Sequence, residues 1–166
     1  MGVRKILSPD IWLDNVKGLH VEHLIRKGVD VFVFDFDNTL APWRSCEISD
    51  DVKRFLKSIQ DRGGIVIIAS NGKPRNIEMN GAVFLWRTGK PLAVKLRRYL
   101  SQKSIDRNRI IIVGDQIFTD VLTGKFLKVL TAKVKPISTK EFFGTRFLRL
   151  IEKVIEPTLK KEEAEK

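Results

Sequence analysis

The chain has 166 residues, 43% of them hydrophobic, a single cysteine and a formal net charge of +11. This length is enough to bury a core but leaves no room for a second domain. No apolar run is long enough to cross a bilayer, no signal-peptide pattern opens the chain, and the lone Cys46 excludes an internal disulfide. We therefore expect one domain in a reducing cytoplasm.

An apolar run over residues 31–34 is the first predicted strand, and two carboxylates follow it. A short unbroken run is typical of a strand buried on both faces, so Asp35 and Asp37 have to emerge at its carboxyl end. In an open parallel α/β sheet, that edge is where ligands bind. One acid can attack as a nucleophile while the other shuttles a proton and a metal ion holds the charge. Chance or a helix cap explains an isolated Asp-x-Asp equally well, so other strand ends have to supply partners.

The second predicted strand spans residues 65–69 and ends at Ser70 and Asn71. A helix over about residues 50–62 precedes it, because four apolar residues there fall at helical spacing. A short helix is expected over residues 74–79. Ser and Asn are also favoured at helix starts, so this pair alone does not mark a site.

The third predicted strand covers residues 82–86 and is followed by Lys90 and Pro91. Because Pro is favoured in the first turn of a helix, we expect Lys90 to lie beside a positive helix end, where a phosphate can bind. Taken alone, Lys90 would be one surface lysine among many. The apolar face of this helix is expected at Leu92, Leu96, Tyr99 and Leu100.

The fourth predicted strand, residues 110–113, leads into Asp115 and Asp120. An ordinary turn and cap is the alternative explanation for these acids. Thr119 is expected to open a helix, and residues 128–135 to form a fifth strand. The inward side chains of that helix are expected to be Val121, Leu122 and Phe126.

The alternation of strands and helices predicts an α/β fold with a parallel sheet in three layers. We expect residues 29–136 to form the catalytic core and residues 1–28 to be a segment packed on or near it. An amphipathic helix over residues 137–157 and a disordered tail over residues 158–166 would follow.

Taken in order, these strand ends resemble the motifs of the haloacid dehalogenase (HAD) superfamily. The matching segments are Asp35-Phe-Asp37-Asn-Thr39-Leu40, Ser70-Asn71, Lys90-Pro91 and Gly114-Asp115-Gln-Ile-Phe-Thr119-Asp120. Together with Lys27-Gly28-Val29, they are similar to the YqeG-type HAD phosphatases, a subgroup related to the mitochondrial phosphatidylglycerophosphate phosphatase. The resemblance covers about residues 16–155 and implies a three-layer, Rossmann-like HAD fold.

The resemblance also implies an activity, that of a magnesium-dependent phosphatase with an aspartyl-phosphate intermediate. Asp35 would be the nucleophile, and Asp37 would protonate the leaving group and then activate water. Pump-type HAD ATPases have Thr at the second position and keep their phosphoenzyme longer, so Asp37 favours rapid hydrolysis.

The implied binding residues divide into two groups. Ser70 and Asn71 would hold the phosphate together with Lys90. The Mg²⁺ ligands would be the Asp35 carboxylate, the Asp37 backbone carbonyl and Asp115, with Asp120 as a further ligand or as the partner of Lys90. Hard oxygen ligands, with no His or Cys cluster in the sequence, favour Mg²⁺.

The spacing between the motifs leaves no room for a cap domain. Residues 41–48 alone separate the first motif from its helix, and about twenty residues lie between Asn71 and Lys90. An open site suits a substrate too large to enclose, such as a lipid head group, a nucleic-acid end or a protein phosphate.

Basic residues surround the predicted site. Residues 73–109 contain ten Lys or Arg (73, 75, 87, 90, 95, 97, 98, 103, 107, 109) against two acids (78, 106). The positive charge of this stretch favours a polyanionic partner, although a solvated surface is the alternative.

Two flanking segments favour a membrane over nucleic acid. Residues 142–155 combine apolar and basic side chains in the pattern of an interfacial helix, and residues 11–13 could add an aromatic anchor. Packing against the domain is the alternative for both segments. Nucleic-acid binding would call for exposed aromatic side chains among the basic ones, and Trp86 and Tyr99 are better explained as core.

We therefore expect a capless HAD phosphatase, cytoplasmic or peripheral at the inner face of the membrane. Its leading substrate is phosphatidylglycerophosphate or a related phospholipid phosphate. A phosphatase for a nucleic-acid end or a phosphoprotein, and a non-catalytic receiver-like module, remain as alternatives. A receiver domain has no use for a second acid as a proton shuttle, so Asp37 disfavours the last of these.

Overall fold

The computed structural model describes residues 6–138 and 150–159. Six strands form one all-parallel sheet in the order β1-β6-β5-β2-β3-β4. The strands are β1 (Ile11–Leu13), β2 (Val31–Phe34), β3 (Ile65–Ser70), β4 (Val83–Trp86), β5 (Ile110–Gly114) and β6 (Leu130–Val134). Strand β2 pairs with β3 on one side and β5 on the other, so the connections diverge there, as at the ligand-binding crevice of open α/β sheets.

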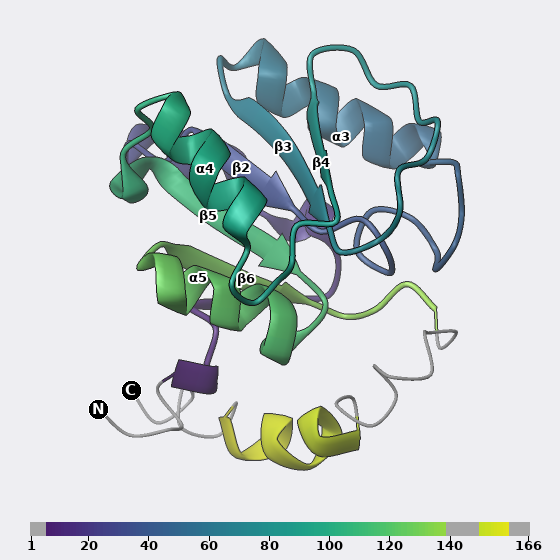
Figure 1. Ribbon diagram of the computed structural model, residues 1–166, viewed down its shortest axis with the longest axis vertical. Coiled ribbons are helices and arrows are strands. Elements are labelled where there is room, and N and C mark those ends of the chain that lie inside the picture. Colours follow the sequence, from purple (N-terminus) through teal and green to yellow (C-terminus); the bar gives the residue numbers. More distant parts are fainter. Residues whose placement is uncertain (1–5, 139–149, 160–166) are drawn as a thin grey trace.

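Helices cover both faces of this sheet, as the predicted three-layer fold requires. The helices are α2 (Val21–Arg26), α3 (Asp50–Asp61), α4 (Val94–Gln102) and α5 (Leu122–Leu127), with a π-helical turn η3 (Ile117–Val121) before α5. In Figure 1, α4 and α5 lie over one face of the sheet. The predicted α/β fold with a parallel sheet is confirmed, and no domain is inserted between residues 35 and 138, all of which are described.

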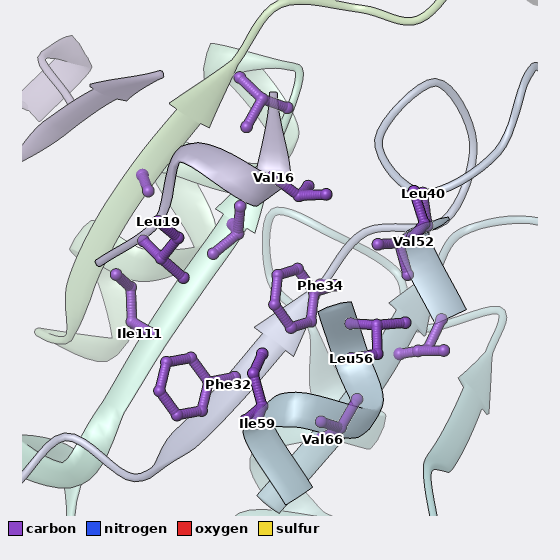
Figure 2. Packing of buried hydrophobic residues seen from close by; sticks show 14 of the residues in the cluster. Val16, Leu19, Phe32, Phe34, Leu40, Val52, Leu56, Ile59, Val66 and Ile111 are labelled. Atoms are coloured by element: carbon purple, nitrogen blue, oxygen red, sulfur yellow. The ribbon is translucent and has the colours of Figure 1, made fainter. Parts of the chain in front are cut away.

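The side chains of β2 alternate between two hydrophobic clusters. Phe32 and Phe34 pack with Leu56 and Ile59 of α3 on one face (Figure 2), while Val31 faces the cluster under α4 on the other. All four β2 residues are at most 1% exposed. A strand buried on both faces can carry Asp only beyond its end, and this fixes the start of the site.

The short helix predicted over residues 74–79 does not form. These residues have no regular secondary structure, and Arg75, Ile77 and Met79 are half-buried while their neighbours are exposed. Burial of every second residue is typical of an extended chain rather than a helix. Ile77 and Met79 pack against the core as the segment returns from the end of β3 to the start of β4.

The helix expected at Pro91 begins three residues later, at Val94. Pro91 follows a cis peptide bond and lies in a turn, and Ala93 has a left-handed conformation with φ 49°, which no helix can continue through. Leu92 is therefore 62% exposed instead of joining the apolar face, whereas Leu96 is buried as expected. Lys90 consequently does not lie at the helix end.

The inward face of α5 was predicted wrongly at Phe126, which is 46% exposed. The closest approach of the helix to the sheet is at Gly124, where an added Cβ would lie 2.1 Å from Cγ2 of Thr131 in β6. Two residues along a helix turn the side chain by about 200°, which points Phe126 away from the sheet. Val121 is buried as predicted, and Thr123, Gly124 and Leu127 are the other buried positions.

Residues 11–13, considered above as an aromatic anchor, form the edge strand β1. The strand pairs with β6, and the Asp10 carboxylate accepts hydrogen bonds from the Thr131 N–H (2.8 Å) and hydroxyl (2.6 Å). Trp12 packs against Ile117, so this segment contributes to the domain. A strand of three residues is too short to be recognised from alternation.

The chain is helical again over residues 150–159 (Figure 1). Glu152 and Leu159 are buried against the domain, whereas Leu150 and Val154 are 62% and 76% exposed. The rest of the predicted amphipathic segment and the tail fall on residues 139–149 and 160–166, outside the described residues. None of the described helices is long and apolar enough to span a bilayer.

Candidate active site

Five of the seven side chains predicted from the strand ends line one cavity at the carboxyl edge of the sheet, and the other two, Asp115 and Asp120, are buried beside Asp35. The cavity has a volume of about 770 Å³. It lies where β2, β3 and β5 end. Its lining includes Asp35, Asp37, Ser70, Asn71, Lys90, Gln116 and Thr119, with Trp43, Arg44, Lys73 and Arg75 also contributing.

Asp35 is the first residue after β2, and its backbone N–H continues the strand pairing by donating to the Val113 carbonyl of β5 (2.9 Å). The residue is 9% exposed, and its Oδ1 lies 2.5 Å from Nζ of Lys90. Burial raises the pKa of the Asp35 carboxyl to about 8; Lys90 opposes the rise, and Asp120 and Asp115 add to it.

Lys90 forms ion pairs with two of the acids. Its Nζ contacts Asp35 at 2.5 Å and Asp120 at 2.6 Å, with 4% of the side chain exposed. Burial alone would lower the pKa of Lys90, but Asp120 and Asp35 outweigh that effect and raise the pKa above its usual range. The amine therefore stays protonated inside the site.

Asn71 fixes the backbone of Lys90. Its Oδ1 accepts from the Lys90 N–H (2.7 Å) and from the Thr88 hydroxyl (3.1 Å), and its Nδ2 donates to the Lys90 carbonyl (3.1 Å). The position of Lys90 is thus set from the end of β3 and not by a helix terminus. Because its amide group is used in this way, the Asn71 side chain holds the lysine in place.

Three buried carboxylates form a cluster that could hold a metal ion. One oxygen each from Asp35, Asp115 and Asp120 lies within 4.8 Å of the others. The Thr39 hydroxyl donates to Asp115 (3.2 Å), and the Gln116 N–H donates to Asp120 (3.1 Å). An all-oxygen set of this kind fits Mg²⁺, and a cation here would stabilise the ionised form of acids that burial disfavours.

The approach of Asp120 depends on a glycine in the neighbouring strand. A Cβ added to Gly114 would lie 2.2 Å from the Asp120 carboxyl carbon, so any side chain there would displace this acid. The glycine therefore allows Asp120 to reach back over the end of β5.

Ser70 lies at the end of β3 and is 2% exposed. Its Oγ accepts a hydrogen bond from the Gly72 N–H (3.0 Å), which leaves the hydroxyl hydrogen available as a donor. Ser70 also lines the cavity.

Asp37 lies further out and has two donors that the sequence did not predict. Oδ1 accepts from the Arg44 backbone N–H (3.0 Å), and Oδ2 accepts from the Arg75 guanidinium (2.8 Å). In the sequence, the alternation of Ile77 and Met79 with polar residues is a signal for an extended segment, which could have placed Arg75 beside the sheet. Thr39 was part of a recognised motif, but its bond to Asp115 depends on the paired ends of β2 and β5.

The comparisons with known proteins agree with this arrangement. A family model described as mitochondrial PGP phosphatase matches residues 1–135. The chain is 27% identical over 163 residues to a protein of Bacillus subtilis (strain 168) named "Probable phosphatase YqeG", and the match covers 96% of this chain and 95% of that protein. No solved structure gives a significant match.

Proposed function

The chain belongs to the mitochondrial PGP phosphatase family of HAD phosphatases, and from this premise we propose that it hydrolyses a phosphomonoester through an aspartyl-phosphate on Asp35. The observation that supports this most directly is the buried contact of Asp35, Lys90 and Asp120, with the Lys90 Nζ within 2.6 Å of both acids. A carboxylate nucleophile needs such a cation to oppose its charge as a phosphate approaches.

In the first step, an Asp35 oxygen attacks the phosphorus and the bond from phosphorus to the leaving oxygen breaks. Asp37 donates a proton to that oxygen, so the product leaves as an alcohol. In the second step, Asp37 takes a proton from water, which attacks the phosphorus of the aspartyl-phosphate. Inorganic phosphate is released, and Asp35 is regenerated.

Other residues bind the phosphate and balance its charge. The Ser70 hydroxyl and a neighbouring backbone N–H donate to a phosphate oxygen, and Lys90 neutralises charge beside Asp35. Mg²⁺, held by Asp35, the Asp37 carbonyl and Asp115 with Asp120 close by, would stabilise the negative charge of the bound phosphate.

The experiment that tests this proposal is hydrolysis of p-nitrophenyl phosphate with Mg²⁺ and then with EDTA. The wild type should turn over only with the metal, and Asp35→Asn, which is nearly isosteric, should keep its fold and lose activity. A receiver-like module would accept a phosphoryl group without sustained turnover. A folded Asp35→Asn variant with wild-type turnover would remove Asp35 from its role.

For the substrate, we propose phosphatidylglycerophosphate or a related phospholipid phosphate, met at an anionic membrane surface on the cytoplasmic side. The open site accepts a head group that remains in a bilayer, and Arg44, Lys73 and Arg75 line it. Leu92 and Val94, 62% and 56% exposed, follow Lys90 in the chain and are available to enter an interface. The family model's description also names PGP phosphatase.

Binding to anionic liposomes tests the lipid proposal. Binding should weaken as salt rises, since each basic residue near the surface contributes about 1 kcal/mol. Leu92→Ser with Val94→Ser should weaken binding yet leave hydrolysis of the soluble ester intact. Phe126→Ser, which changes an exposed ring on α5, is the matched control and should bind like the wild type.

The same experiment identifies the alternative substrates. Wild-type protein that ignores anionic liposomes but binds single-stranded nucleic acid with a steep salt dependence would favour a nucleic-acid end as the substrate. Activity on a phosphopeptide without binding to either surface would favour a phosphoprotein.

A further inference from the structure

Arg75 contacts the proposed proton-transfer group directly, from a segment that sequence patterns assigned to a helix. Its Nη2 donates to Asp37 Oδ2 (2.8 Å), and its Nη1 donates to the Ser45 carbonyl (2.9 Å). We infer that Arg75 is a positioning residue, which holds the Asp37 carboxylate in the orientation needed for proton transfer. This inference rests on the proposed role of Asp37.

The Arg75 guanidinium also contacts two aromatic rings. Its central carbon lies 5.2 Å from the centre of the Phe36 ring and 5.9 Å from that of Trp86. The two rings contact each other at 5.5 Å, and Phe36 is fully buried. Phe36 stands between the two catalytic acids in the sequence, so the group that supports Arg75 is part of the same rigid segment as Asp37.

Asp37 is restrained at both of its carboxylate oxygens. The Arg44 backbone N–H contacts Oδ1 at 3.0 Å and Arg75 contacts Oδ2, so rotation of the carboxylate would break at least one bond. Gly72 packs closely against the pair, because an added Cβ would lie 3.3 Å from Asp37 Oδ2 and 3.4 Å from Arg75 Nη2. Hydrogen bonds to both oxygens of a carboxylate, from two different residues, fix its orientation more firmly than a single bond does.

Arg75 also lines the cavity, so direct phosphate binding is the alternative role for it. Against that role, Nη1 and Nη2 each donate already to a protein oxygen, and the side chain is only 15% exposed. Lys73 is exposed on the wall of the same cavity and is better suited to meet a phosphate from solution. The two roles predict different kinetics, because positioning affects proton transfer and phosphate binding affects KM.

The test compares an alkyl ester, glycerol 3-phosphate, with an aryl ester, p-nitrophenyl phosphate, whose phenolate needs little protonation as it leaves. Arg75→Met keeps the apolar stem over the rings and removes the donors. In single-turnover measurements of phosphoryl transfer to Asp35, the step that the leaving group affects, we expect it to lower the rate on the alkyl ester by about 10- to 100-fold and on the aryl ester by less than about threefold, with the half-saturating ester concentration changed by less than about twofold on either. Arg75→Lys keeps the charge but loses the planar fork, so it should fall between the wild type and Arg75→Met.

Two further variants separate positioning from other effects. In an Asp37→Asn background, Arg75→Met should add little further loss, because the group that it positions is already inactive. Lys73→Met removes one positive charge from the same cavity and should raise KM for both esters alike. Circular dichroism melts establish that each variant is folded.

The possible outcomes decide between the two roles. Equal rises in KM on both esters for Arg75→Met, with kcat unchanged, would make Arg75 a phosphate-binding group and overturn the inference. The inference would also be overturned if the double variant lost activity by the full product of the losses of Arg75→Met and Asp37→Asn. If Asp37→Asn itself shows no dependence on the leaving group, the proposed role of Asp37 fails first, and that failure is visible without any change at Arg75.

Discussion

Replacing the proposed nucleophile, Asp35→Asn, should stabilise the metal-free protein at alkaline pH. The Asp35 carboxyl has a pKa of about 8 in the folded chain, chiefly because of burial, against an ordinary value of 3.8. Between these two values the folded protein holds a proton that the unfolded chain has released. The free energy of unfolding of the wild type therefore falls as the pH rises from about 4 to about 8.

The asparagine is neutral at every pH and close to aspartic acid in shape, so the variant lacks this fall. The difference in stability should grow by at most about 1.4 kcal/mol per pH unit and by at most about 4 kcal/mol between pH 5 and 8. Loss of the Asp35–Lys90 pair opposes the gain, but Lys90 keeps Asp120 at 2.6 Å. In a chain of this size, each kcal/mol shifts Tm by about 2–4 °C.

Urea unfolding of both proteins in EDTA at several pH values between 5 and 8 measures this difference. Near pH 5 the two proteins should have similar free energies of unfolding, and at pH 8 the variant should be the more stable. Added Mg²⁺ should narrow or reverse the gap, because a bound cation favours the ionised Asp35 of the wild type. A variant that is less stable than the wild type at pH 8 in EDTA, or a difference that does not change with pH, would refute this reasoning.

Three further predictions concern other parts of the structure. Asp115→Asn should raise the Mg²⁺ concentration needed for half-maximal activity by about 10-fold or more, and an unchanged titration would argue against a metal at this cluster. Glu152→Ala should lower the free energy of unfolding by about 1–3 kcal/mol, because Glu152 accepts hydrogen bonds from two backbone N–H groups in residues 117–118, at 2.7 and 3.1 Å. Glu152→Gln keeps an acceptor oxygen, so it should lose less stability in the same urea melts. Gly124→Ala should cost about 1–3 kcal/mol through its contact with Thr131, and Thr131→Ser, which removes the methyl group, should restore much of that stability.

The strand ends could be predicted because burial on both faces leaves few places for a carboxylate. Asp35 and Asp115 follow strands that are fully buried, and parallel strands end at one edge, so their meeting follows from topology alone. The fold class was predictable for the same reason. These features depend on runs of apolar residues, which single sequences display clearly.

The errors arose where a distant contact decides the local structure. Residues 74–79 could form one helical turn, but such a turn is marginal by itself, and Arg75 is bound to Asp37 and Ser45 instead. The exposure of Phe126 follows from the fit of Gly124 against β6, which no helical pattern contains. In both cases a tertiary contact outweighs a local preference.

Residues that contact the site from distant parts of the sequence could not be predicted from sequence patterns either. Glu152 is 1% exposed and caps the turn that carries Asp120, although about thirty residues separate them. Nothing in its neighbourhood distinguishes it from the other acids of a mixed-charge segment. Its role depends on where the helical residues 150–159 dock on η3.

Chemical trapping of the phosphoenzyme tests the central claim most directly. The protein is mixed with p-nitrophenyl phosphate and Mg²⁺, quenched in acid and treated with borohydride, which reduces an aspartyl-phosphate to homoserine, and its peptides are read by mass spectrometry. The account predicts homoserine at position 35, in larger amount in Asp37→Asn because hydrolysis of the intermediate is slowed. Homoserine at another position, or turnover with no reduced Asp35 in either protein, would contradict it.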